Sequence, residues 1–168
     1  EEFKDRQQRT LDGAQVLADT LIRRFGEHRA PLALGVASLL FGFPIFFDAG
    51  LVVMLPVVFA VARRLGGSVL LYALPSVGAF SVMHVFLPPH PGPVTAATFF
   101  EANVGYIILV GLICAIPTWY VSSYLFGKFS GRRIKLPVPA ILGQAEDVRN
   151  PPAVGTVVAM LLLPMLLI

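Results

Sequence analysis

The chain has 168 residues, of which 56% are hydrophobic and 14% charged, and its formal net charge is +3. A soluble domain averages nearer half apolar and a quarter charged residues, so this composition excludes an ordinary soluble protein. The single cysteine, Cys114, excludes an intrachain disulfide framework and a cysteine-based metal site. The basic residues cluster at the ends of apolar runs, which indicates cytoplasmic loops rather than a surface that binds nucleic acid.

The N-terminal part of the chain contains no membrane-spanning run. Residues 1–11 form a polar lead that does not resemble a signal peptide. Residues 12–29 predict an amphipathic helix with Leu21 and Phe25 on its apolar side and Gly26 as its C-cap. A helix lying in the membrane interface is favoured over a connecting helix packed on the protein, because apolar spans follow immediately.

The next apolar segment, residues 31–62, predicts a re-entrant helical hairpin. Its arms, 31–47 and 49–62, are each shorter than the roughly 20 residues that a full crossing requires. Arginines flank both outer ends, which indicates that the segment enters and leaves the membrane by the same face. Helix-breaking residues surround the midpoint, so we expect the hairpin tip at residues 47–50.

A tight turn at Gly66-Gly67 leads into residues 68–100, which predict a single crossing made by a broken transmembrane helix. The break is expected at residues 88–93, because four prolines in six residues cannot stay helical. The proline segment either lies inside the protein or forms a plain surface turn. Both alternatives give the same topology.

The remaining apolar runs predict one complete span and part of another. Residues 105–127 form the cleanest transmembrane helix, about 35 Å long. Residues 128–152 are expected to be a cytoplasmic loop, and residues 153–168 the start of a truncated transmembrane helix. The prediction is therefore an all-α integral membrane fold, with 1–168 a single partial membrane domain.

Asp48 is a lone carboxylate within the hairpin and the first candidate functional residue. A charge at that depth costs several kcal/mol unless it faces a partner or a water-filled cavity. One interpretation makes Asp48 an N-cap that accepts backbone N–H bonds at the start of the second arm. The other makes it a coupling or substrate-facing group, and the two interpretations are compatible.

Two histidines lie at the proline segment: His84 on the helix that enters the break, and His90 within the break. A lone membrane histidine is often a hydrogen-bonded core residue, but two beside a helix break favour a proton-responsive site. Their spacing fits no recognised metal motif, and we expect neither a metal nor another cofactor.

The resumed helix after the break is a candidate anion site. Pro93 suits a first helical position, which would leave the N–H groups of residues 94–96 pointing at the break as a cradle for a carboxylate. The Thr95 hydroxyl either adds a ligand contact or makes an ordinary cap or backbone bond. The complete set of candidate substrate- and proton-binding residues is Asp48, His90, His84, Gly50, Gly92, Thr95 and Phe47.

Two runs, GFPIFFDAGLVVMLPVVFAVARR and YALPSVGAFSVMHVFLPPHPGPVTAA, resemble the gluconate:proton symporters of the gluconate permease family. The likeness covers roughly residues 13–168. It implies a multi-pass carrier of the bacterial inner membrane, driven by proton influx, within the wider ion-transporter superfamily. It also implies a fold of two inverted repeats, each with a re-entrant hairpin and a broken helix, so that this chain would supply one repeat.

The resulting functional hypothesis is uptake of gluconate or a related sugar acid together with a proton, and not an enzyme activity. The expected partners are a gluconate-like organic anion, a proton and the lipid bilayer, without nucleic acid, and a homo-oligomer is left open. One alternative is an intramembrane enzyme that uses Asp48 and a histidine as acid and base, although no nucleophile or metal is evident. The other is a structural membrane subunit in which these side chains only satisfy each other.

Overall fold

The computed structural model of the chain describes residues 16–139 and the single residues 153, 155, 156, 159 and 163. The predictions for residues 1–11 and 153–168 therefore lie wholly or largely outside the described residues. Every regular element in the described part is helical, which confirms the predicted all-α class.

Two helical segments of the described chain are long and apolar enough to cross a membrane, Val69–Phe99 and Val104–Arg133. They correspond to the two crossings that the sequence predicts. The described helices therefore suit an integral membrane protein. The course of the hairpin relative to the bilayer stays a prediction.

The first described helix covers residues 16–25. Leu17 and Ile22 are buried on its inner side, and Phe25 packs against the same apolar core. The helix ends at Gly26, whose N–H donates to Ile22 O at 2.8 Å and whose φ of 84° lies in the region that favours glycine. A short 3₁₀ turn, η1 (Glu27–Arg29), leads into the hairpin.

The hairpin consists of α2 (Ala30–Gly42) and α3 (Phe47–Leu65), joined by residues 43–46. With 13 and 19 residues, the two helices are about 20 Å and about 28 Å long. Helix α2 is shorter than the roughly 20 residues of a complete crossing, whereas α3 is close to that length and longer than the predicted second arm, 49–62.

The position of the tip differs from the prediction. Residues 47–50, expected to be the non-helical tip, form the first turn of α3, and the turn itself is residues 43–46. Pro44 interrupts the chain after α2, and the Gly50 N–H already donates to Phe46 O at 2.9 Å. The helix tolerates Gly50 because this residue packs directly against Phe80 of the neighbouring helix, where a side chain has no room.

The next crossing is broken, as the prolines predict. Helix α4 (Val69–Phe86) ends before residues 87–90, which contain a cis bond between Pro88 and Pro89, and α5 (Pro91–Phe99) follows. Helix α5 begins at Pro91, two residues before the expected Pro93. Either proline suits the first turn of a helix, where no intrahelical partner is needed for the missing N–H.

The last described helix runs without interruption through α6 (Val104–Trp119), the π-helical segment η2 (Tyr120–Leu125) and α7 (Phe126–Arg133). Asn103 caps it, because its Oδ1 accepts the N–H groups of Gly105 at 2.9 Å and of the next residue at 3.3 Å. The helix begins close to the predicted position.

The end of this helix differs from the prediction, which assigns residues 128–133 to a loop. Gly127 and Gly131 do not end the helix, because they allow close approach to α4. A methyl group at position 127 would touch Pro75, and one at position 131 would touch Leu71. The loop therefore begins at Ile134 within the described part of the chain.

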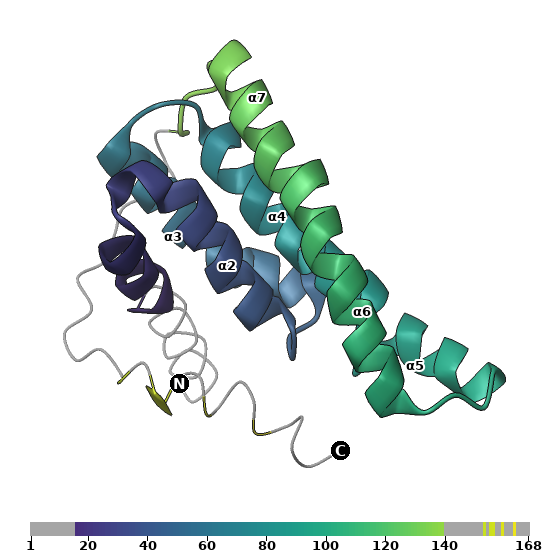
Figure 1. Cartoon of the computed structure of the whole chain (residues 1–168). Coiled ribbons are helices and arrows are strands. Elements are labelled where there is room, and N and C mark those ends of the chain that lie inside the picture. Colours follow the sequence, from purple (N-terminus) through teal and green to yellow (C-terminus); the bar gives the residue numbers. More distant parts are fainter. Residues whose placement is uncertain (1–15, 140–152, 154, 157–158, 160–162, 164–168) are drawn as a thin grey trace.

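Helix α4 lies at the centre of the bundle. It packs against α2 and α3 on one side and against α6, η2 and α7 on the other, while α5 lies beside α6 beyond the end of the hairpin (Figure 1). The Trp119 indole N–H donates to Pro75 O at 2.8 Å and joins the long helix to α4 in the core. This arrangement brings the turn of the hairpin and the break after α4 to the same end of the bundle.

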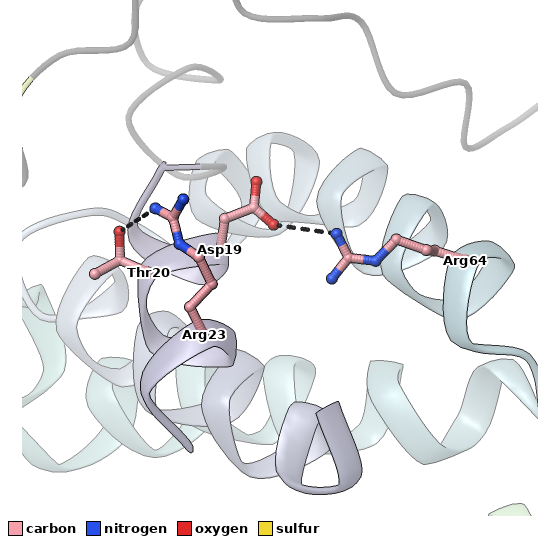
Figure 2. Close-up of polar contacts among 4 residues, drawn as sticks. All are labelled: Asp19, Thr20, Arg23 and Arg64. Carbon is pink, nitrogen blue, oxygen red and sulfur yellow. Dashed lines mark hydrogen bonds and ion pairs between the residues drawn. The ribbon is translucent and has the colours of Figure 1, made fainter. Parts of the chain in front are cut away.

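The opposite end of the bundle carries the cationic residues. Arg63 donates to Pro139 O at 2.9 Å, and the Val69 N–H donates to Leu136 O at 2.9 Å, so the segment after α7 returns to the turn between α3 and α4. The Arg64 guanidinium lies 3.9 Å from the Asp19 carboxylate of the first helix (Figure 2). A cationic end of this kind is typical of a cytoplasmic face.

Candidate functional site at the hairpin turn and the helix break

The turn of the hairpin contacts the helix break through three rings and one backbone carbonyl. His90 Nε2 lies 3.1 Å from Gly42 O, the last residue of α2. The His84 and His90 ring centroids are 4.7 Å apart, and Phe46 lies 6.3 Å from His84 and 5.9 Å from His90. Since a carbonyl only accepts, His90 carries a proton on Nε2. Two elements far apart in sequence therefore form one site.

His90 is fixed on several sides. It is only 2% exposed, and it precedes the first residue of α5. Its N–H donates to Leu87 O at 3.2 Å, and its carbonyl accepts the N–H of Val94 at 3.1 Å. With its ring held by Gly42, His90 ties the break to the hairpin and has little freedom to move.

His84 has a different environment. It lies in the last turn of α4 and is partly exposed, but its Nδ1 atom is buried and has no hydrogen-bond partner among the described residues. A buried polar atom without a partner costs about 1–3 kcal/mol. The site therefore contains one nitrogen whose hydrogen-bonding capacity is not used by the described protein.

Asp48 is exposed in the first turn of α3, close in sequence to Phe46. The N-cap of α3 is Phe46, and no side chain accepts a capping bond there, so the N-cap interpretation of Asp48 is wrong. The Asp48 carboxylate forms no ion pair or hydrogen bond with any described residue, the two histidines included. It is therefore open to a ligand, a proton or another part of the protein.

The other two candidates on the hairpin have packing contacts. Gly50 is buried against Phe80, and Gly42 approaches the same ring. Phe47 is partly buried against the core formed by α2, α3 and α4. Both candidates hold the hairpin turn in position against α4.

The predicted anion cradle at residues 94–96 differs from the structure. The Val94 N–H is not free, because it donates to His90 O. Of the first three residues of α5, only Gly92 has an amide N–H, since Pro91 and Pro93 have none. The beginning of α5 is therefore poor in donors, because the helix starts earlier than predicted.

Gly92 and Thr95 both lie exposed on α5. No atom lies within 4 Å of a methyl group built at Gly92. The Thr95 hydroxyl makes no hydrogen bond with a described residue, whereas the neighbouring Thr98 donates to Val94 O at 3.0 Å. The structure brings His84, His90 and the hairpin turn together. Gly92 and Thr95, in contrast, lie exposed outside this group of contacts.

Two components of the site were missed by the sequence interpretation: the Phe46 ring and the Gly42 carbonyl. Pro44 is the sequence signal that could have identified the carbonyl, because a proline near the end of a helix leaves the last carbonyls of that helix without intrahelical donors. The sequence contains no comparable signal for the Phe46 ring. Within the described residues no group of three or more histidine, cysteine, aspartate or glutamate side chains could hold a metal ion.

Comparison with known proteins decides the family. The model of the GntP family permeases matches residues 9–168. The chain belongs to the GntP permease family. The family consists of permeases rather than enzymes, which agrees with the two spanning-capable helices.

Three relatives with curated names illustrate the family. The chain is 42% identical to the gluconate permease of Bacillus subtilis strain 168 over 82% of this chain and 30% of that protein. It is 46% identical to the Gnt-II system L-idonate transporter of Escherichia coli K12 over 74% of this chain and 28% of the relative. It is 31% identical to the inner membrane permease YgbN of Escherichia coli K12 over 93% of this chain and 37% of that protein.

The chain thus spans about a third of the length of the GntP permeases it matches. No solved structure matches it significantly. The region that the family model matches, residues 9–168, includes both the hairpin and the broken helix.

Proposed function

We propose that the intact GntP permease that contains this chain takes up gluconate or a related sugar acid together with a proton, across the inner membrane of a bacterium. Relatives named as a gluconate permease and an L-idonate transporter support the substrate class. The relative named as an inner membrane permease supports the location.

The contact between the hairpin turn and the helix break carries this proposal. It places the His84–His90 ring pair at the position where α2 and α4 both stop, and the exposed Asp48 follows in the next turn of the chain. Helices that stop within a transporter leave backbone groups available for substrate and coupling ions. This end of the bundle is therefore the substrate and proton site in our proposal.

Proton coupling would depend on Asp48, because His90, the other protonation candidate, already has its Nε2 proton held by Gly42 O. A protonated Asp48 removes a negative charge from the site and favours the binding of an organic anion there. By linkage, the bound anion then favours protonation to the same extent. Release of both on the other side of the membrane would complete a cycle of symport.

The test is uptake by the intact permease in sealed liposomes. With an inside-alkaline pH gradient we expect accumulation of radiolabelled gluconate, and an acidification of the lumen that a trapped pH-sensitive dye reports. A protonophore should abolish the accumulation. An uptake rate that does not depend on the pH gradient would contradict proton coupling. The absence of both uptake and binding for every sugar acid tested would contradict the substrate class.

A further inference from the structure

The two histidines of the site differ in what satisfies their ring nitrogens. His90 Nε2 has a protein partner in Gly42 O, and its ring is almost completely buried. His84 Nδ1 is buried without a partner among the described residues, although its ring is partly exposed. The His90 ring is thus held by the protein, whereas His84 Nδ1 remains able to form a hydrogen bond with a ligand.

The surroundings of His84 would let a ligand reach this buried nitrogen once the Phe46 ring has moved aside. The rings of His84, His90 and Phe46 all pack against one another, and Phe46 is 59% exposed. A ligand that displaces the Phe46 ring would meet His84 first, because His84 is partly exposed whereas His90 is only 2% exposed and held against Gly42.

We propose that His84 binds the transported sugar acid directly through Nδ1, whereas His90 is a positioning residue that holds the hairpin turn against the helix break. An unprotonated Nδ1 accepts a hydrogen bond from a substrate hydroxyl, and a protonated Nδ1 donates one to the carboxylate. A polyhydroxy acid offers both groups. This assignment rests on the proposed function, because it names a contact of the same substrate.

The chemistry of His84 has a consequence for specificity. A site built to hydrogen-bond a substrate hydroxyl rejects the analogue that lacks it far more strongly than an apolar site does. Gluconate analogues that each lack one hydroxyl should therefore reveal the contact. In a His84→Leu variant, the analogue without the contacted hydroxyl should bind as well as gluconate does.

Four variants of the intact permease separate the two roles. His84→Leu removes the ring nitrogen, and His84→Asn keeps a polar atom near the position of Nδ1. His90→Leu removes the bond to Gly42, and His90→Gln keeps a donor near the position of Nε2. For each variant, KM and the maximal rate of gluconate uptake and the melting temperature without substrate are measured.

We expect His84→Leu to raise KM by about tenfold or more, which corresponds to about 1.4 kcal/mol or more of binding. Its melting temperature should not fall, because Nδ1 has no hydrogen bond to lose among the described residues and leucine keeps an apolar side chain against the two neighbouring rings. His84→Asn should recover most of the affinity. His90→Leu should instead lower the melting temperature and the maximal rate, and His90→Gln should restore both.

An unchanged KM in His84→Leu, with gluconate transport by the wild type intact, would overturn the role of His84 and leave the proposed function standing. A fall in its melting temperature equal to that of His90→Leu would also overturn it, because His84 would then be a packing residue. Failure of the wild type to bind or transport any sugar acid would overturn the proposed function itself.

Discussion

Asp48→Asn is expected to abolish proton-driven gluconate uptake by the intact permease while leaving gluconate exchange across the membrane intact. Asparagine resembles protonated aspartate in size and charge, so the substrate still binds. The side chain has no proton to release, and the linkage between anion and proton is lost. Uptake under a pH gradient should fall by about 100-fold, equivalent to about 2.8 kcal/mol.

The control for this variant is Glu101→Gln, which makes the same charge change at an exposed residue in the turn between α5 and α6. Its uptake should match that of the wild type. A normal rate of gradient-driven uptake in Asp48→Asn would show that Asp48 does not take part in proton coupling. An equal loss of uptake in Glu101→Gln would show that the loss comes from the change in net charge and not from position 48.

Gly50→Leu is expected to have the largest effect on stability. A methyl group at position 50 already overlaps the ring of Phe80, which is fully buried and has no free space to enter. Overpacking of a closed core costs about 1–3 kcal/mol for modest additions and more for a complete side chain. The hairpin should separate from α4, so both the melting temperature and gluconate uptake should fall steeply.

Ala49→Leu introduces the same side chain one residue earlier, where the native residue is exposed, and should leave the melting temperature unchanged. Phe80→Ala provides the rescue, because the double variant with Gly50→Leu regains space at the contact. Residues in contact show non-additive energies in such a cycle. Strictly additive losses in melting temperature would show that Gly50 and Phe80 do not meet.

Local sequence rules predict the elements that depend on local causes. The run of prolines breaks the helix between α4 and α5 at the expected position. Gly66 and Gly67 form the turn between α3 and α4 with φ of 74° and 92°, which other residues rarely adopt. Apolar length and the clustered arginines likewise predict a membrane protein with one cationic end.

The sequence predicted the wrong positions for elements that depend on contacts between helices. Gly50 looked like a helix breaker, but it sits inside α3 because Phe80 occupies the space that a side chain would need. The last span was expected to end at residue 127, although the packing of Gly127 and Gly131 against α4 keeps that helix intact to Arg133. A single sequence shows that a glycine is present, but not which residue lies opposite it.

The sequence predicted most of the residues of the candidate site, but not how they are arranged in space. The sequence identified both histidines and Asp48, but not that the ring of His90 would be held by the last carbonyl of α2. It also missed Phe46, since two adjacent phenylalanines in an apolar run give no indication of which one is exposed. Such assignments require the relative position of the hairpin and α4, which is set by the whole bundle.

The most direct test of the central claim is substrate protection at the hairpin turn. In an intact permease without other cysteines, a Phe46→Cys variant is treated with a small hydrophilic thiol reagent, with and without gluconate. We predict rapid labelling without substrate, and protection that increases with gluconate concentration and saturates near its KM, while an unrelated sugar gives none. Labelling at the same rate with and without saturating gluconate would contradict a sugar-acid site at the junction of the hairpin turn and the helix break.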